Sequence, residues 1–104
     1  MSIEEIDVDG LAARMEDGAV LVDVREPTEI AQVRVSGVLP IPLGDLPGRA
    51  GEIPDTGTVY VICRSGARSA RACEHLNAKG RHAVNVAGGI LAWIDSGRPT
   101  ETGD

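Results

Sequence analysis

Three short apolar runs are separated along the chain by polar segments and by stretches with apolar residues at helical spacing. The runs cover residues 19–24, 58–62 and 83–86. Each has the length of a β-strand rather than that of a helix. Residues 19–24 have the composition of a parallel strand that is buried on both faces of its sheet. The pattern therefore predicts three strands with other elements between them.

Two weaker segments predict strands at the edges of the sheet. Ile3 and Ile6 alternate with glutamates, which is typical of a short edge strand. Farther along, Pro40 and Pro42 bracket Ile41. Proline has no backbone N–H to give to a sheet, so a strand here should lie at an edge or outside the sheet.

Helical spacing of apolar residues, together with caps and glycines, predicts helices between these strands. They are expected at residues 28–32, 43–50 and 69–79, around Leu11, Ala12 and Met15 behind a cap at Asp7 or Asp9, and after the Gly88–Gly89 turn. Strands that alternate with short helices predict an α/β fold, in which helices flank a mainly parallel sheet.

Composition limits the classes of protein that the chain can belong to. Its 104 residues predict one domain, 1–104, with residues 97–104 as a frayed polar tail. A net charge of −6 argues against a nucleic-acid or membrane-surface binder. No apolar run approaches the roughly 20 residues that span a bilayer, and residues 1–10 lack the apolar core of a secretory signal. Two cysteines without metal-ligand spacing indicate a reducing, cytoplasmic location.

The segment after residues 58–62 concentrates the candidate chemistry. An apolar strand ends at Cys63, a loop of small residues and arginines follows at 64–68, and helical spacing resumes after it. In open α/β sheets, ligands bind at the carboxyl ends of the strands. A loop that curls into a helix start also directs successive backbone N–H groups inward, so that they can hold an anion.

A thiol at the mouth of such a loop has good reason to ionise. A free cysteine has a pKa of about 8.5 and is mostly protonated at pH 7. A helix N-terminus and the neighbouring arginines, Arg64 and Arg68, can lower that pKa by about two units, which makes the thiolate the major form. The alternative interpretation is that Cys63 is a small buried hydrophobic residue at a strand end.

Three stretches resemble the rhodanese family of sulfurtransferases. Residues 63–69, Cys-Arg-Ser-Gly-Ala-Arg-Ser, are similar to its active-site loop, and residues 21–26 and 85–93 resemble its first and closing signatures. The resemblance implies a five-stranded, mainly parallel sheet with helices on both faces. Residues 33–37 depart from it, because Val-Arg-Val-Ser-Gly stands where the family usually has Gly-His-Ile-Pro.

The resemblance also implies a reaction. Cys63 would attack the outer sulfur of a small anionic donor such as thiosulfate, release sulfite and carry a persulfide to cyanide, a thiol or a protein acceptor. The backbone of Arg64, Ser65, Gly66, Ala67 and Arg68 would hold the terminal sulfur, and the two arginine side chains would bind the sulfonate. No metal or organic cofactor is implied. The donor, the acceptor and the oligomeric state are left open.

Supporting roles for other residues have structural alternatives. Ser65 or Ser69 could donate a hydrogen bond to the thiolate, although a helix cap is the favoured interpretation of Ser69. Asp23 and Arg25 follow a predicted strand and could approach Cys63, or they could form a structural ion pair. Cys73 is expected to be a core thiol rather than a resolving cysteine.

Two other functions remain open at the level of sequence. The first is a cysteine phosphatase, but only four residues separate Cys63 from Arg68, where such phosphatases resemble one another in having five. They also need a general acid, for which Asp23 is a weak candidate. The second is a non-catalytic sulfur-carrier or interaction module.

Overall fold

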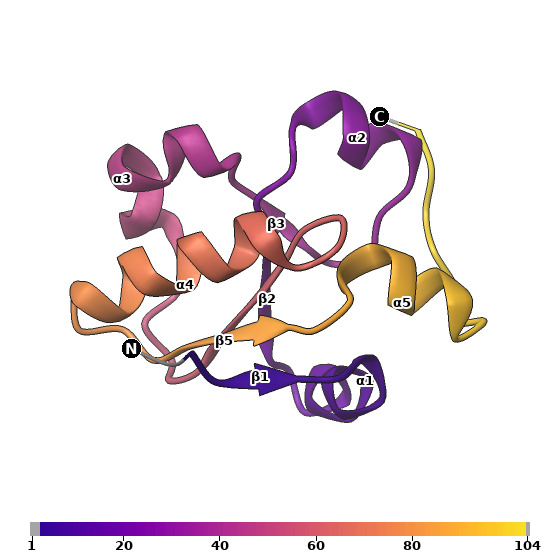
Figure 1. The fold of residues 1–104 in the computed structure, drawn as a ribbon, viewed down its shortest axis with the longest axis horizontal. Coiled ribbons are helices and arrows are strands. Elements are labelled where there is room, and N and C mark those ends of the chain that lie inside the picture. The colour runs from indigo at the N-terminus through magenta and orange to yellow at the C-terminus, as the bar shows by residue number, and fades with distance from the viewer. Residues whose placement is uncertain (1–2, 104) are drawn as a thin grey trace.

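Five short strands form one sheet in which every neighbouring pair runs parallel (Figure 1). The computed structural model describes residues 3–103. The strands are β1 (Glu5–Ile6), β2 (Val20–Asp23), β3 (Leu39–Pro40), β4 (Val59–Ile62) and β5 (Ala83–Val86), in the order β1-β5-β4-β2-β3. The structure confirms the predicted α/β fold with a five-stranded parallel sheet.

Helices cover both faces of this sheet. They are α1 (Val8–Glu16), α2 (Pro27–Gln32), α3 (Leu46–Arg49), α4 (Ala67–Ala78) and α5 (Gly89–Asp95), with short 3₁₀ turns at Leu43–Asp45 and Ala50–Glu52. The core residues of α3 and α4 pack on one face, and those of α1 and α5 pack on the other. None of the helices within residues 3–103 has the length and hydropathy needed to cross a membrane.

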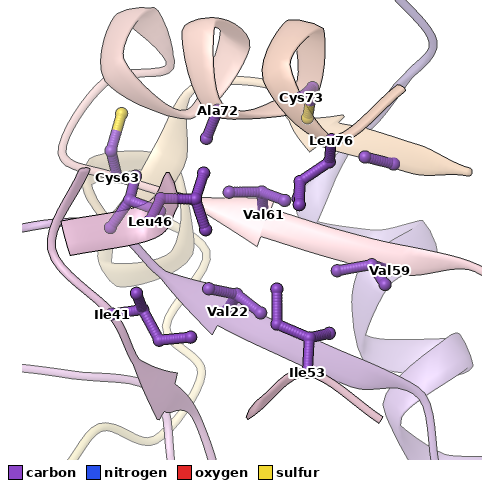
Figure 2. Close-up of a cluster of buried hydrophobic side chains, with 12 residues drawn as sticks. Val22, Ile41, Leu46, Ile53, Val59, Val61, Cys63, Ala72, Cys73 and Leu76 are labelled. Atoms are coloured by element: carbon purple, nitrogen blue, oxygen red, sulfur yellow. The ribbon is translucent and has the colours of Figure 1, made fainter. Parts of the chain in front are cut away.

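β4 lies at the centre of the sheet, and all four of its residues are buried. Successive side chains point to opposite faces, so Val59 and Val61 pack under α4 while Tyr60 and Ile62 pack toward α1 and α5. Figure 2 shows the α4 side of this core, with Cys63 at the end of β4. The central strand thus delivers Cys63 to the edge of the sheet where the parallel strands end.

Helix boundaries differ from the predicted ones where loop geometry intervenes. Asp7 rather than Asp9 caps α1, and its carboxylate accepts a hydrogen bond from the Gly10 N–H at 2.8 Å. α4 begins at Ala67, two residues before the predicted start, so Ser69 lies inside the first turn. The favoured interpretation of Ser69 as a helix cap is therefore wrong. The reason is that Gly66 takes the capping position in the left-handed region, with φ of 116°.

The segment predicted as one helix at residues 43–50 is instead a 3₁₀ turn, a single turn of α-helix and a second 3₁₀ turn. Two glycines and a proline within eight residues explain the difference, because these residues disfavour a continuous helix. Leu46 is nevertheless buried against the α4 side of the core.

Pro40 lies at the sheet edge, as predicted. It pairs with Asp23 of β2, and β3 has no strand on its other side among the described residues. The expectation of a frayed tail at residues 97–104 is wrong for its described part. Arg34 and Glu101 exchange backbone hydrogen bonds of 2.9 and 2.8 Å, and the Gly103 N–H donates to the Ala31 carbonyl at 2.7 Å. The tail stays in place because it satisfies backbone groups of an irregular segment.

Candidate active site

The loop between β4 and α4, residues 63–66, wraps around the sulfur of Cys63 and is called the sulfur loop below. The Gly66 N–H donates to Sγ at 3.1 Å, and the Ser69 hydroxyl lies 3.2 Å from it. Figure 2 shows the sulfur directed toward the first turn of α4. Cys63 as a residue is almost fully buried, with 1% of its surface exposed.

Burial and hydrogen bonding act in opposite directions on this thiol. Burial raises the pKa of Cys63 because it penalises the charged thiolate. Hydrogen bonds from the Ser69 hydroxyl and from the backbone N–H groups of Ser69, Gly66 and Ser65 outweigh it, so the pKa lies below its usual value. The site therefore shifts Cys63 toward the thiolate form, mainly through hydrogen-bond donors rather than through the arginines expected from the sequence.

The N-terminus of α5 orients the loop. The N–H of Ile90 donates to the Cys63 carbonyl at 2.8 Å, and that of Leu91 donates to the Arg64 carbonyl at 3.2 Å. In a trans peptide the N–H points opposite to the carbonyl. Binding these two carbonyls on the α5 side therefore turns the N–H groups of the following residues away from α5, into the loop.

Gly89 makes this close approach possible. A Cβ at this position would lie 2.5 Å from the carbonyl oxygens of both Cys63 and Arg64, and the φ of 58° is unfavourable for other residues. The Gly88–Gly89 pair was predicted as a tight turn. Its contact with the sulfur loop is visible only in the structure.

Asn85 is a site residue that the sequence reasoning missed. It lies on β5 with 2% of its surface exposed, and its Oδ1 is 2.5 Å from Ser69 Oγ. Its Nδ2 donates to the Gly66 carbonyl at 3.2 Å and to Glu5 Oε2 at 3.1 Å. A polar residue within the buried run Ala-Val-Asn-Val was the available signal, because a buried amide needs partners.

The two candidate arginines lie in different surroundings. Arg68 forms a bidentate pair with Glu29 of α2, with Nη1–Oε1 and Nη2–Oε2 distances of 2.7 and 2.8 Å. The hydrogen bond from Arg68 is the main reason that the pKa of Glu29 falls to about 2. Arg64 is exposed and makes no salt bridge within residues 3–103. Arg64 thus has no acidic partner among the described residues, whereas Arg68 shares its charge with Glu29.

Asp23 and Arg25 form a buried ion pair with an Nη2–Oδ2 distance of 2.8 Å. Arg25 also donates to the carbonyls of Val33 and Glu29, at 2.7 and 3.4 Å. Neither side chain hydrogen-bonds the Cys63 sulfur. Of the two interpretations, the structural one fits this geometry, because the pair ties β2 to the end of α2 and so places Glu29.

Cys73 belongs to the core, as expected. It is fully buried among the apolar side chains under α4, and Figure 2 places it well along the helix from Cys63. Burial raises the pKa of Cys73 to about 12. Both cysteines are free thiols. Burial and the raised pKa both disfavour the thiolate form that a resolving cysteine would need.

Comparison with known proteins gives the family. The model of the rhodanese-like domain matches residues 7–96. The chain belongs to the rhodanese-like family. It is 43% identical over 100 residues to a sulfurtransferase of Allochromatium vinosum, with 93% of this chain and 94% of that one covered. It is 34% identical to the putative sulfur carrier protein YrkF of Bacillus subtilis, over 88% of this chain and 51% of that protein.

A solved structure gives the same result for the fold. The crystal structure of a rhodanese-related protein from Thermoplasma volcanium has a TM-score of 0.88 and 32% sequence identity, with 94% of this chain and 97% of that chain covered.

A hollow of about 560 Å³ lies beside the sulfur loop of this rhodanese-like domain. Its lining residues are Arg68, Arg71 and His75 of α4, Glu26, and Leu43, Gly44, Leu46 and Pro47. Leu46 also packs in the same core cluster as Cys63. The hollow provides room next to the loop for a molecule larger than a single anion. No cluster of three or more His, Cys, Asp or Glu side chains suited to a metal ion occurs within residues 3–103.

Proposed function

We propose that this rhodanese-like domain is a sulfurtransferase in which Cys63 carries the transferred sulfur as a persulfide. The observation that carries the proposal is the position of Sγ, within 3.2 Å of both the Gly66 N–H and the Ser69 hydroxyl, at the start of α4. A thiolate held by donors is a nucleophile without a general base. The sulfurtransferase and sulfur carrier among the relatives support the same chemistry.

The reaction consists of two displacements. The Cys63 thiolate attacks the outer sulfur of a small anionic donor such as thiosulfate. An S–S bond to Cys63 forms, the S–S bond of the donor breaks, and sulfite leaves with the electron pair. A nucleophilic acceptor, which can be cyanide, a thiol or a protein thiolate, then attacks the terminal sulfur, and Cys63 leaves as the thiolate.

The loop assists both steps through its donors. The backbone N–H groups of residues 64–68 stabilise the negative charge on the terminal sulfur, as preorganised donors do in other active sites. Arg64 is the first contact for the sulfonate end of the donor, because its side chain is exposed and unpaired within the described chain. Arg68 can contribute only by sharing or exchanging its bond with Glu29. The two free thiols suit a reducing compartment such as the cytoplasm.

Mass spectrometry of the intact protein tests the proposal directly. Incubation with thiosulfate should add one sulfur atom to the wild type, and cyanide should remove it with formation of thiocyanate. Cys63→Ser should take up no sulfur, because a serine alkoxide is inaccessible at neutral pH. Cys73→Ala is the matched control and should behave as the wild type. Sulfur found on the Cys63→Ser variant, or none on the wild type, would refute the proposal.

The same proteins separate this function from its alternatives. A sulfur-carrier module would form the persulfide but would not turn over thiosulfate and cyanide repeatedly. A phosphatase would hydrolyse an aryl phosphate through Cys63. We expect repeated sulfur transfer and negligible phosphate hydrolysis, because Asp23, the weak candidate for a general acid, is fully buried and paired with Arg25.

A further inference from the structure

Asn85 connects the sulfur loop to an exposed carboxylate on the far side of β5. β5 lies between β1 and β4 and packs against α4 (Figure 1). From this position the Asn85 amide reaches Ser69 and Gly66 above the sheet and Glu5 on β1 beside it. Four side chains therefore form one chain of contacts, from Glu5 through Asn85 and Ser69 to Cys63.

The neighbours of Asn85 fix the orientation of its amide. The two partners of Nδ2 are the Gly66 carbonyl and the Glu5 carboxylate, at 3.2 and 3.1 Å. Both accept hydrogen bonds, so turning the amide round would place Oδ1 against two other acceptors. The amide must therefore present Oδ1, an acceptor, to Ser69.

Ser69 has a single hydroxyl proton and more than one place to put it. Its Oγ lies 2.5 Å from Asn85 Oδ1, 3.2 Å from Cys63 Sγ and 3.2 Å from the Gly66 carbonyl. One O–H can make only one good hydrogen bond at a time. The nearest acceptor is Asn85, not the sulfur.

We propose that Asn85 competes with the Cys63 sulfur for the proton of Ser69, and so limits how far Ser69 favours the thiolate. Asn85 is a positioning residue that acts through Ser69. In the thiol form, the Ser69 hydroxyl donates its hydrogen bond to Asn85 Oδ1. When the sulfur ionises, its negative charge attracts the Ser69 hydroxyl, which then donates to Sγ instead of to Asn85 Oδ1. The free energy of the lost bond to Asn85 must be subtracted from the stabilisation of the thiolate by Ser69.

This restraint is useful to a sulfurtransferase, and in that respect the inference rests on the proposed function. Thiolates become weaker nucleophiles as their pKa falls, and an attacking thiol is most effective when its pKa lies near the ambient pH. Several donors around Cys63 lower its pKa. An acceptor that competes for one of these donors weakens its effect on the pKa of Cys63, so the thiolate keeps more of its nucleophilicity.

A double-mutant cycle with Asn85→Ala and Ser69→Ala tests the competition. The rate of Cys63 alkylation by iodoacetamide is followed against pH, and peptide mass spectrometry assigns the modified cysteine. No sulfur donor is involved, so the result is independent of whether sulfur transfer occurs.

Ser69→Ala alone should raise the midpoint of the alkylation profile. Asn85→Ala should lower the midpoint more when Ser69 is present than when Ser69 is absent. The difference between the two shifts should be about half to one pH unit, which corresponds to the free energy of one neutral hydrogen bond. Any loosening of the loop by Asn85→Ala occurs in both backgrounds and cancels. The effects of the other charged groups around the loop are the same in both backgrounds and cancel as well; these groups are Arg64, Arg68, Glu29, Asp23 and Glu5.

An equal shift in both backgrounds would overturn the proposal, since Asn85 would then act without Ser69. A higher midpoint only when Ser69 is present would also overturn it, since Asn85 would then help Ser69 to hold the thiolate. Asn85→Ser replaces the alanine variant if the latter does not fold. Asn77→Ala is the matched control: the Asn77 side chain accepts from the Ala83 N–H at 2.8 Å at the other end of α4, so its loss should lower stability without moving the profile.

Discussion

At the scale of single residues, the two arginines of the site differ in whether their charge is paired. Arg64 is exposed beside the loop, whereas Arg68 is held by both carboxylate oxygens of Glu29. A bidentate arginine–carboxylate pair is geometrically specific, but these side chains remain about one-third exposed, at 33% and 30%. Their pairing therefore contributes little to stability, and we expect an anionic donor to be able to compete with Glu29 for Arg68.

Variants at the two arginines should affect donor binding more than folding. We expect Arg64→Gln to raise the KM for thiosulfate several-fold, because it removes the free cation at the mouth of the loop. Arg68→Ala should raise it less, since Glu29 already neutralises much of that charge. Steady-state kinetics with thiosulfate and cyanide would measure both effects. The free energy of unfolding, followed by thermal denaturation, should change by less than about 1 kcal/mol in each variant.

Glu29→Gln is the informative partner of these variants. Without the carboxylate, Arg68 becomes available to the donor, so the KM for thiosulfate should fall below that of the wild type. Glu52→Gln serves as the control, because Glu52 forms a comparable pair with Arg49 on the exposed surface. An unchanged KM in Glu29→Gln would show that Arg68 takes no part in donor binding.

At the scale of elements, the sulfur loop owes its shape to α5 as much as to α4. α4 supplies the Ser69 hydroxyl, while α5 binds the carbonyls of Cys63 and Arg64 from outside. The two helices lie on opposite faces of the sheet, so their N-terminal ends hold the loop from both sides at the end of β4 (Figure 1). The contact at Gly89 is the point at which this arrangement is most easily broken.

Gly89→Ala should damage the loop more than an ordinary strained glycine substitution. The new Cβ would lie 2.5 Å from two carbonyl oxygens, so either α5 or the loop must move. Backbone strain of this kind costs about 1–3 kcal/mol. We expect a lower melting temperature and a large fall in the rate of Cys63 alkylation.

Gly18→Ala is the matched control for Gly89→Ala. Gly18 also has a positive φ, of 84°, but a Cβ there would have nothing within 4 Å. The Gly18→Ala variant should lose some stability but keep the wild-type rate of Cys63 alkylation. Equal alkylation rates in the two variants would show that the α5 contact does not shape the site.

At the scale of the whole molecule, the C-terminal segment ties distant parts of the chain together. The Trp93 indole N–H donates to the Pro99 carbonyl at 3.0 Å, and Arg98 pairs with Asp9 of α1 at 2.8 Å. Glu101 then exchanges its backbone hydrogen bonds with Arg34. None of these contacts involves the sulfur loop.

A chain that ends after residue 96 should therefore be less stable but chemically competent. Several hydrogen bonds and part of the cover of Trp93 would be lost, which should lower the free energy of unfolding by roughly 2 kcal/mol. Denaturant unfolding followed by tryptophan fluorescence measures this loss. Persulfide formation on Cys63 below the unfolding transition should match the full chain, and its loss there would show that the tail supports the site.

The sequence by itself determined the central strands and singled out the candidate nucleophile. Buried parallel strands must be apolar on both faces, so β2, β4 and β5 are visible as short continuous runs. Proline cannot donate to a ladder, so Pro40 indicated an edge. Cys63 was found because a cysteine between a strand and a loop of small residues is a local pattern.

Only the tertiary structure decided what surrounds that cysteine. The partners of the loop lie far away in sequence: Asn85 meets Ser69, Glu29 takes Arg68, and Gly89 lies against Cys63. Local patterns carry information about side-chain periodicity and turn chemistry, whereas these contacts depend on which strands become neighbours. A hydrogen bond has a range of about 3 Å, so the donors and acceptors around the sulfur are defined only once the sheet has assembled.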